Sequence, residues 1–370
     1  MTSRNAQHMT EKRRVNRVIM FPGHGNKDEN RYIDVLVKSI RDAGVEVESW
    51  NKHFSRQRGD IFHVHWPELV ADIRRRKYQL LRGQWIAFQF FRTIRRIKKH
   101  GGRVVWTVHG LTPHDKRLGG SAFLERFMSR FISCVDVALS LTSAGIAEIK
   151  QAIPALSGVP HFVTRHPHYK GILGPGVYKQ DVRRRLGIFR DQKVFAFVGT
   201  LRPDKRPDLV AQAFRDLPID RAFLIMAGSA SAEMTETITK LTKGWPNVRL
   251  DLRRVPEEEI IELYSVSDIL VFPGTNYFNS GTIYTALSLG VPVIAAWSPS
   301  NCEIQDIVGA QWLYLYQGVF SRELLEDASR VLIRRDTGAS CDLTAFAPEV
   351  CAIQHIQAYE NALSRPRSGQ

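Results

Sequence analysis

Short apolar runs alternate with helical segments along most of this chain, and the alternation forms two series. The runs of the first series lie at residues 17–21, 45–47, 61–65, 104–108 and 135–141. Those of the second lie at residues 194–198, 221–227, 248–252, 269–272 and 292–296, with candidate helices at 207–215, 232–241, 257–264 and 282–289. Strands that alternate with helices predict a parallel sheet covered by helices. The sequence therefore predicts an α/β protein made of two similar halves.

The segment 160–186 interrupts this alternation because proline and glycine are frequent in it. We interpret it as a linker between a first domain, residues 15–170, and a second domain, residues 185–345. A chain of 370 residues, 44% of them hydrophobic, also exceeds what one core usually organises. We expect two Rossmann-like domains facing each other across a cleft, with the helical segment 348–365 packing back on the first domain.

The formal net charge of +15 attracts polyanions such as nucleic acid, anionic lipid or phosphorylated substrates. No acidic residue occurs between Ile73 and His114, whereas lysine and arginine are frequent there. Apolar residues recur at helical spacing among these cations, at Ile86, Phe90, Ile94 and Ile97. This pattern fits equally a basic amphipathic helix lying on an anionic membrane and a helix that faces the core with a solvated basic back.

Neither a membrane span nor a secretory signal is predicted. No run of about 18 apolar residues occurs, and the first residues are polar and basic. We therefore expect a cytoplasmic protein. The four cysteines lie far apart without a C-x-x-C spacing, which predicts neither a zinc site nor a disulfide framework.

Polar side chains follow several apolar runs of the first half, where the carboxyl ends of parallel strands meet. They are His24, Asn26, His65, Glu68, His109, His114, Asp115, Thr142 and Ser143. Ligands of such sheets bind beyond this edge, and several histidines converging there indicate a functional site. We expect His63, two residues before His65 on the same strand, to be a packed or backbone-bonded imidazole, and His166 and His168 to be structural.

In the second half, Ser280, Gly281 and Thr282 stand between an apolar run and a helix. Small residues at a helix start expose backbone N–H groups to an anion, although they also suit an ordinary N-cap. Arg202 and Lys205 follow the run 194–198. Fixed cations there could neutralise a diphosphate leaving group, and a surface salt bridge is the alternative interpretation.

The chain resembles glycosyltransferases of the GT-B architecture. The similarity is carried by GTLRPDKRPDLVAQAF at 199–214 and VSDILVFPGTNYFNSGTIYTALSLGVPVIAA at 266–296. FHVHWPEL, VVWTVHGLTPHD and RHPHYKGIL resemble bacterial exopolysaccharide and β-mannosyltransferase-like enzymes of that superfamily.

The resemblance implies that the chain transfers a sugar from a nucleotide-diphosphate donor to a lipid-linked or polysaccharide acceptor. It favours GDP-mannose, with UDP-sugars as alternatives, and a place on the cytoplasmic face of the inner membrane. The implied donor-binding residues are Arg202, Lys205, Asn279, Ser280, Gly281 and Thr282, and the implied acceptor-side residues are Gly25, Asn26, His65 and His114.

One departure from the family pattern concerns the mechanism. Many retaining GT-B enzymes carry two glutamates eight positions apart, where this chain has Tyr277 and Thr285. We therefore expect an inverting reaction, in which a general base takes a proton from the acceptor hydroxyl. Asp115 is the preferred base, with His109 and Glu68 as alternatives. We expect no cofactor and no metal, because Arg202, Lys205 and the helix start can neutralise the leaving group.

Two other classes of function compete with this interpretation. The calculated pI of about 9.8 and the basic-aromatic segment suit a nucleic-acid-binding protein, but two α/β halves with paired phosphate loops argue against nucleic acid as the partner. Another nucleotide-sugar enzyme is the second alternative. An epimerase needs a G-x-G-x-x-G turn after its first strand, which Pro22, Gly23, His24 and Gly25 do not supply. A phosphorylase needs pyridoxal phosphate on a lysine, which no motif indicates.

Overall fold

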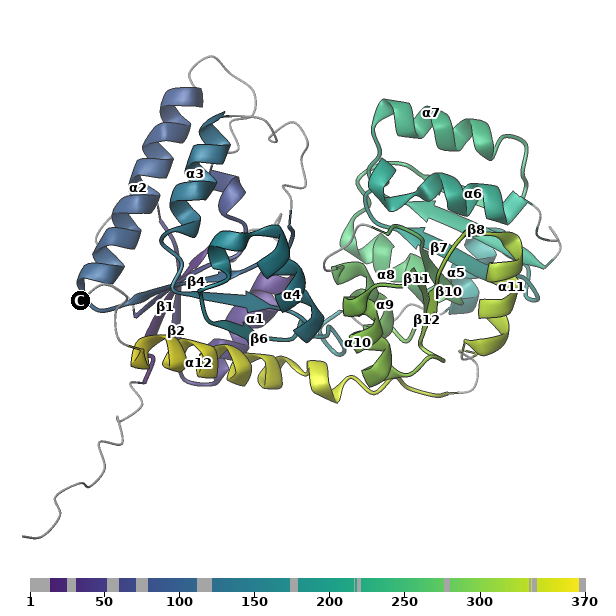
Figure 1. The fold of residues 1–370 in the computed structure, drawn as a ribbon. Coiled ribbons are helices and arrows are strands. Elements are labelled where there is room, and N and C mark those ends of the chain that lie inside the picture. Colours follow the sequence, from purple (N-terminus) through teal and green to yellow (C-terminus); the bar gives the residue numbers. More distant parts are fainter. Residues whose placement is uncertain are drawn as a thin grey trace, which may run out of the picture. The chain divides into compact units, whose positions relative to one another are not determined.

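A computed structural model gives the structure of the chain. It describes residues 14–24, 31–51, 60–70, 79–111, 122–173, 179–215, 217, 221–275, 280–332, 334 and 338–365. These residues form two six-stranded parallel sheets, each in its own compact unit (Figure 1). The prediction of two Rossmann-like α/β domains is confirmed. Unit 1 contains the described residues up to Arg165 and those from Pro348 onward, and unit 2 is His166–Ala347.

The sheet of unit 1 has the strand order β2-β1-β3-β4-β5-β6. Its strands are β1 (Arg17–Phe21), β2 (Glu46–Ser49), β3 (Ile61–Val64), β4 (Arg103–Thr107), β5 (Val137–Ser140) and β6 (His161–Val163). Its helices are α1 (Arg31–Asp42), α2 (Gln79–Lys99), α3 (Ala122–Ile132), α4 (Ser143–Ala152) and α12 (Pro348–Ser364), with 3₁₀ turns η1 (Pro67–Val70) and η2 (Pro154–Leu156).

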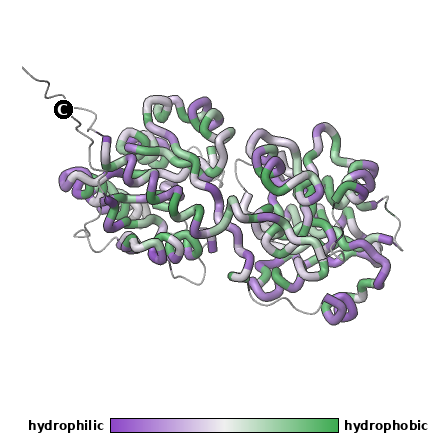
Figure 2. The backbone as a smooth tube through the Cα atoms, turned by 90° about the horizontal axis from the view of Figure 1, so that it is seen from below, coloured by the Kyte–Doolittle hydropathy of each residue, from purple (hydrophilic) through white to green (hydrophobic). Residues whose placement is uncertain are grey.

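Alternate residues of these strands face two different helical layers, as strand geometry requires. Val105 of β4 joins the core formed with α1 and α12, whereas its neighbour Trp106 packs edge-on against Phe131 of α3. Because both faces are covered, the strands are continuous apolar runs rather than alternating ones. In Figure 2 the hydrophilic stretches accordingly lie mostly at the periphery of each unit.

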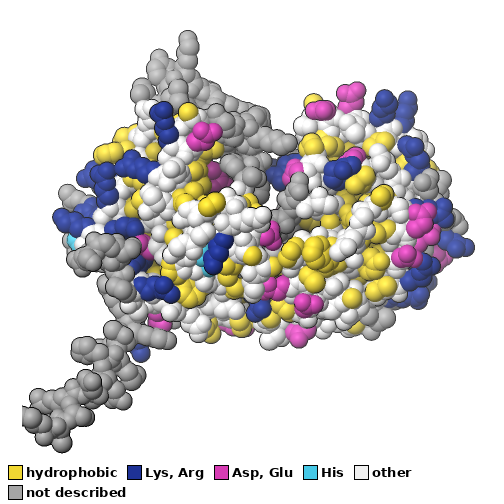
Figure 3. All heavy atoms as spheres, in the orientation of Figure 1, with side chains coloured by type: hydrophobic (Ala, Val, Ile, Leu, Met, Phe, Trp, Pro, Cys, Tyr) yellow, Lys and Arg dark blue, Asp and Glu magenta, His cyan; other side chains and the backbone are white. Residues whose placement is uncertain are grey.

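The apolar stripe of α2 faces the core of unit 1. Phe90, Ile94 and Ile97 are buried, and Phe90 packs against Phe62 of β3 and Phe131 of α3. Of the two interpretations of this segment, the core-facing helix is therefore correct for these residues. The basic side chains of α2 lie over the outer side of the unit, where Figure 3 shows lysine and arginine gathered.

Helix α12 belongs to unit 1 although it comes last in the chain. It packs against α1, and the hydroxyl of Tyr359 lies 2.7 Å from Nδ1 of His63 on β3. Ala352, Ala358, Ala362 and Leu363 complete its buried face. The three alanines of this face let the helix approach the sheet closely.

The sheet of unit 2 has the strand order β12-β11-β10-β7-β8-β9. Its strands are β7 (Lys193–Val198), β8 (Ala222–Ala227), β9 (Val248–Asp251), β10 (Ile269–Phe272), β11 (Val293–Ala296) and β12 (Leu313–Tyr316). Its helices are α5 (Lys179–Arg185), α6 (Pro207–Arg215), α7 (Ala232–Leu241), α8 (Glu257–Val266), α9 (Gly281–Ser288), α10 (Pro299–Val308) and α11 (Arg322–Val331), with 3₁₀ turns η3 (Pro203–Lys205) and η5 (Thr344–Phe346).

The expected linker at 160–186 contains regular structure. Strand β6 and helix α5 both fall inside it, and the units divide after Arg165 rather than near residue 170. β6 is only three residues long and lies between Pro160 and Pro167, and the prolines therefore indicated a linker instead of a strand.

In the described part of the chain, no helix is long and apolar enough to cross a membrane.

Candidate functional site

The strand order of unit 2 reverses between β7 and β10. From β7 the chain proceeds to β8 and β9 on one side, and then to β10 on the other side. Ligands of open parallel sheets bind in the crevice outside the carboxyl ends of the strands at such a reversal. The residues that follow β7 and β10 are therefore the first candidates for a ligand site.

Two glycines bring the backbone together at this edge. Gly199 follows β7 with φ +131°, and Gly228 follows β8 with φ +141°. A methyl group on Gly228 would lie 2.0 Å from the carbonyl oxygen of Gly199, which no side chain could tolerate. The two strand ends are thus in direct backbone contact, and the space on the Cβ side of Gly199 is left to side chains.

Lys205 and Thr282 occupy that space. A methyl group on Gly199 would lie 3.5 Å from Nζ of Lys205 and 3.8 Å from Oγ1 of Thr282, so the two groups converge on one point from different loops. Burial, together with the nearby charge of Arg202, lowers the pKa of Lys205 to about 8, while Asp204 opposes the shift. A desolvated ammonium group of this kind gains stability when an anion binds beside it.

Arg202 is half-buried in the same loop. Its Nη2 donates to Oδ2 of Asp204 at 3.0 Å, whereas its Nε is buried without a hydrogen-bond partner among the described residues. An unsatisfied buried donor costs on the order of 1–3 kcal/mol. A ligand oxygen that accepted from Nε would remove this cost.

Helix α9 starts on the β10 side of the crevice. Ser280 is its N-cap residue, and its side chain makes no capping hydrogen bond. The first turn also contains no acidic residue. The backbone N–H groups of a helix start have no partner inside the helix, and here the side chain that usually satisfies one of them does not do so.

Two aromatic rings brace this helix start. His166 lies parallel to Tyr284 of α9, with ring centroids 4.2 Å apart and an interplanar angle of 4°. Nε2 of His166 would lie 3.6 Å from a methyl group on Gly281. From the sequence we expected His166 to be structural, and Tyr284 was absent from the predicted site, because no local pattern connects residues so far apart in the chain.

The sheet of unit 1 also reverses its order, between β1 and β3. His65 follows β3 and His109 follows the neighbouring β4, and Nδ1 of His65 lies 2.9 Å from Nε2 of His109. His65 is buried and His109 is half-exposed. Burial lowers the pKa of His65 well below its usual value, with His63 and His109 adding to the shift. His65 is therefore uncharged at neutral pH while it is hydrogen-bonded to His109.

Aromatic side chains enclose this pair. Trp66 stacks on His109 with a centroid distance of 4.4 Å and an interplanar angle of 21°. Tyr32 of α1 meets the rings of His65 and His109 edge-on. Trp66 and Tyr32 were absent from the predicted site. The position of Trp66 directly after His65 is a sequence signal that could have indicated Trp66 as part of the site.

His63 is a packed side chain, as expected. Its Nε2 lies 2.7 Å from Oγ1 of Thr107, and its Nδ1 lies at the same distance from the hydroxyl of Tyr359. Burial lowers its pKa well below the usual value. With both nitrogens engaged inside the unit, His63 joins β3, β4 and α12.

Glu68 lies in η1, beyond the end of β3. Burial raises the pKa of its carboxyl group to about 7, and a backbone hydrogen bond opposes the shift. A carboxyl group with a pKa near neutrality can both take and return a proton, which suits general acid–base chemistry.

Five predicted site residues lie outside the described residues. They are Gly25, Asn26, His114, Asp115 and Asn279. The structure thus brings together Lys205 with Thr282, and His65 with His109.

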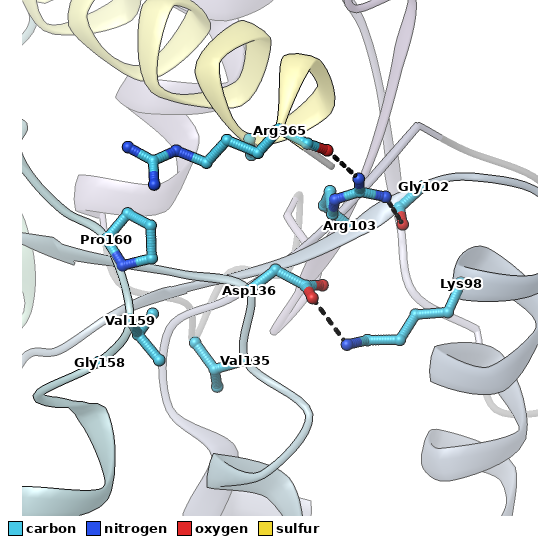
Figure 4. A pocket seen from close by; sticks show the side chains of 10 residues that line it. Lys98, Gly102, Arg103, Val135, Asp136, Gly158, Val159, Pro160 and Arg365 are labelled. Carbon is cyan, nitrogen blue, oxygen red and sulfur yellow. Dashed lines mark hydrogen bonds and ion pairs between the residues drawn. The ribbon is translucent and has the colours of Figure 1, made fainter. Parts of the chain in front are cut away.

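A cavity of about 420 Å³ lies at the opposite, amino-terminal edge of the sheet of unit 1 (Figure 4). Lys98 pairs with Asp136 at 2.8 Å, and Arg103 donates to the backbone carbonyls of Gly101, Gly102 and Arg365. Since these two cations are engaged by the protein itself, we interpret them as joining α2, β4 and the end of α12.

The described residues contain no group of three or more His, Cys, Asp or Glu side chains placed to hold a metal ion. The four cysteines are unpaired, and Cys341 and Cys351 are buried.

Residues 179–306 match the protein family described as Glycosyl transferases group 1. The chain is 26% identical to GDP-mannose:glycolipid 4-beta-D-mannosyltransferase of Xanthomonas campestris pv. campestris, over 92% of this chain and 90% of that protein. It is also 26% identical to D-inositol 3-phosphate glycosyltransferase of Thermobispora bispora, over 96% of each chain.

Solved structures share the fold at low sequence identity. HepE of Anabaena, in complex with UDP and glucose, has a TM-score of 0.58 at 14% identity, covering 93% of this chain and 94% of its own. Sucrose-phosphate synthase of Thermosynechococcus elongatus has a TM-score of 0.59 at 13% identity, covering 94% and 96%. The family match and the two parallel-sheet units together identify the chain as a glycosyltransferase of the GT-B fold, with a group 1 glycosyl transferase domain in unit 2.

Proposed function

We propose that this enzyme transfers mannose from GDP-mannose to a lipid-linked acceptor in the synthesis of an exopolysaccharide or another cell-surface glycan. The nearly full-length similarity to a GDP-mannose:glycolipid mannosyltransferase supports this donor and this class of acceptor. A UDP-sugar is the alternative donor, and polysaccharide is the alternative acceptor.

The observation that carries the proposal is the convergence of Lys205 and Thr282 beside Gly199. We assign the diphosphate to this crevice, with Lys205 and Arg202 on the β7 side and Ser280, Gly281 and Thr282 on the α9 side. Asn279 is assigned to the same diphosphate site because it directly precedes Ser280 in the sequence. The buried ammonium group of Lys205 and the free Nε of Arg202 both gain from an anionic ligand.

These groups neutralise the departing nucleoside diphosphate without a metal ion. Two cations and a helix start supply the positive charge that a divalent ion supplies in other transferases. We therefore expect transfer to persist in the presence of a chelator and to require no cofactor.

We propose an inverting reaction, because Tyr277 and Thr285 replace the carboxylate pair of many retaining relatives. Asp115 is assigned as the general base from its place after β4, with Glu68 and His109 as alternatives. Glu68 has the pKa near neutrality that this role favours, and His109 is held by His65 and Trp66 at the same sheet edge. Gly25, Asn26, His65 and His114 complete the proposed acceptor side.

The outer face of α2 is assigned to an anionic membrane surface on the cytoplasmic side of the inner membrane. One exposed stripe runs along the helix at alternating spacings of three and four residues, comprising Trp85, Phe88, Arg92, Arg95 and Lys99. Aromatic residues occupy its first part and cations its second part, which suits insertion at the headgroup level beside anionic lipid.

A binding panel tests the donor assignment. GDP, UDP, ADP and their sugar conjugates are added to the purified enzyme, and the thermal unfolding midpoint is followed. A ligand at a hundred times its dissociation constant stabilises the folded state by about 2.7 kcal/mol. We expect GDP and GDP-mannose to raise the midpoint most. A rise with UDP-sugars alone would reassign the donor, and no rise with any of these ligands would refute the diphosphate site.

A further inference from the structure

His166 lies at the start of unit 2 and packs under the first turn of α9. The residue is 5% exposed, its ring lies flat on Tyr284, and Tyr169 meets the ring edge-on at 5.7 Å. Tyr284 is in turn held edge-on by Phe346 at 5.3 Å. The imidazole is therefore held by the rings of Tyr284 and Tyr169, and Phe346 in turn holds Tyr284.

The hydrogen bond of His166 defines its protonation. Nδ1 lies 2.8 Å from the carbonyl oxygen of Pro167. A carbonyl oxygen only accepts, so Nδ1 carries the proton and donates it. Burial lowers the pKa of His166 to about 4, against the opposing effect of this hydrogen bond. At neutral pH the ring is therefore uncharged, and its Nε2 carries a lone pair.

That lone pair faces the beginning of α9. Nε2 would lie 3.6 Å from a methyl group on Gly281, the first residue of the helix. The N–H groups of a first helical turn are donors without partners inside the helix. A neutral acceptor beside them is compatible with the positive end of the helix, whereas a protonated imidazole would be repelled by it.

The same segment holds the other end of α9. The backbone N–H of Tyr169 donates to Oγ of Ser288 at 2.8 Å, and Ser288 donates to the carbonyl of Tyr284. Residues 166–169 thus run along the whole length of the helix, with His166 at its first turn and Tyr169 at its last.

We propose that His166 is a positioning residue for the donor diphosphate: its neutral ring, held by Pro167 and stacked on Tyr284, fixes the first turn of α9 in the orientation that binds phosphate. The inference rests on the proposed function, because it assigns the diphosphate to the start of α9. Preorganised groups must be held within fractions of an ångström, and a displacement of about 1 Å can cost as much as 10²-fold in rate.

His166→Phe tests this role, since phenylalanine preserves the stack on Tyr284 and removes both ring nitrogens. Two controls accompany it. His355→Phe removes a matched buried histidine of unit 1, whose Nδ1 donates to the carbonyl of Cys351 at 2.7 Å and whose pKa burial also lowers to about 4. Ser288→Ala loosens the far end of α9. His166→Gln returns an acceptor to the position of Nε2 and serves as the rescue variant.

The dissociation constant of GDP is measured by calorimetry for each variant, together with the thermal midpoint and the KM and kcat for donor. We expect His166→Phe to weaken GDP binding about tenfold or more and to raise the donor KM. His166→Gln should recover part of the affinity, and both controls should stay within about twofold of wild type. If His166→Phe does not fold, the comparison of His166→Gln with His166→Ala replaces it, with tighter GDP binding expected for the glutamine variant.

Two results would overturn the inference alone. One is GDP binding by His166→Phe equal to that of wild type, and the other is an equal loss in Ser288→Ala, which would indicate a general loosening of α9. If the wild-type enzyme binds none of the nucleoside diphosphates, the proposed function itself fails, and this inference fails with it.

Discussion

Nζ of Lys205 and Oγ1 of Thr282 converge on the same side of Gly199, 3.5 and 3.8 Å from the point where a methyl group on that glycine would lie. Lys205 reaches this point from the loop after β7, and Thr282 from the first turn of α9 after β10. The carboxyl ends of β7 and β10 adjoin at the reversal of strand order, which is why two distant loops meet there.

Removing the ammonium group should weaken donor binding and turnover together. Lys205→Ala takes away a charge that both holds the diphosphate and stabilises its departure, so we expect a higher donor KM and a kcat lower by roughly 10²-fold or more. Steady-state kinetics measure both. Arg206→Ala is the matched control, because Arg206 is an exposed cation of the same loop that pairs with Asp208 on the surface.

The lowered pKa of Lys205 adds a pH signature to this prediction. Below about pH 8 the group is charged in the free enzyme and attracts the diphosphate, and above that value it becomes neutral. The affinity for GDP should therefore fall as pH rises through about 8 in wild type, and Lys205→Ala should lose this dependence. A wild-type affinity that is flat between pH 7 and 9 would contradict the assignment.

Gly228 after β8 and Gly281 at the start of α9 should differ sharply in their tolerance of a side chain. Gly228→Ala places a methyl group 2.0 Å from a backbone oxygen at a φ of +141°, and we expect a loss of at least about 3 kcal/mol of folding free energy. Gly281→Ala meets His166 at an ordinary 3.6 Å and should change stability by less than about 0.5 kcal/mol. Thermal and urea unfolding measure both, and equal midpoints for the two variants would show that the backbone contact is misplaced.

The exposed stripe of α2 should decide membrane attachment. Changing Arg92, Arg95 and Lys99 to Gln should reduce binding to anionic vesicles, since each cation near such a surface contributes on the order of 1 kcal/mol. Vesicle sedimentation at rising salt measures this. The triple variant Arg190→Gln, Lys240→Gln and Lys243→Gln removes the same charge from exposed positions of unit 2 and should bind like wild type. Equal losses in both variants would mean that net charge alone drives binding.

The general base should act on turnover and leave donor affinity unchanged. Asp115→Asn should lower kcat by roughly 10²–10⁴-fold with little effect on GDP binding, because the base contacts the acceptor proton. Rapid-quench or steady-state assays with matched calorimetry separate the two effects. Normal turnover in this variant would move the assignment to Glu68. Because the pKa of Glu68 is about 7, the rate should then rise as pH increases through 7. Glu68→Gln should remove this pH dependence.

Much of the fold followed from apolar patterning, and particular failures show the limit of that approach. The strand cores were found because strands covered on both faces are continuous apolar runs. β6 was missed because three residues between prolines carry too little pattern. The stripe of Phe90, Ile94 and Ile97 could not be assigned to a core or a membrane from sequence, since either surface selects the same apolar face.

The residues of the candidate site were likewise predicted only in part. His65 and His109 were predicted at one sheet edge because both follow strands, and β3 and β4 are indeed neighbours. The stack of His166 on Tyr284 could not be predicted, because it depends on how residues 166–169 pack along α9, and side chains far apart in the chain leave no periodic signal. The buried Nε of Arg202 and the lowered pKa of Lys205 likewise depend on burial, which emerges only when the loops are placed.

The most direct test of the central claim is transfer of radiolabelled mannose from GDP-mannose into the lipid fraction of membranes that contain the acceptor. We predict incorporation by the wild-type enzyme, a strong reduction with Lys205→Ala, and near wild-type incorporation with Arg206→Ala. Incorporation from a UDP-sugar but not from GDP-mannose would contradict the donor assignment, and no lipid-linked product from any nucleotide sugar would contradict the proposed function.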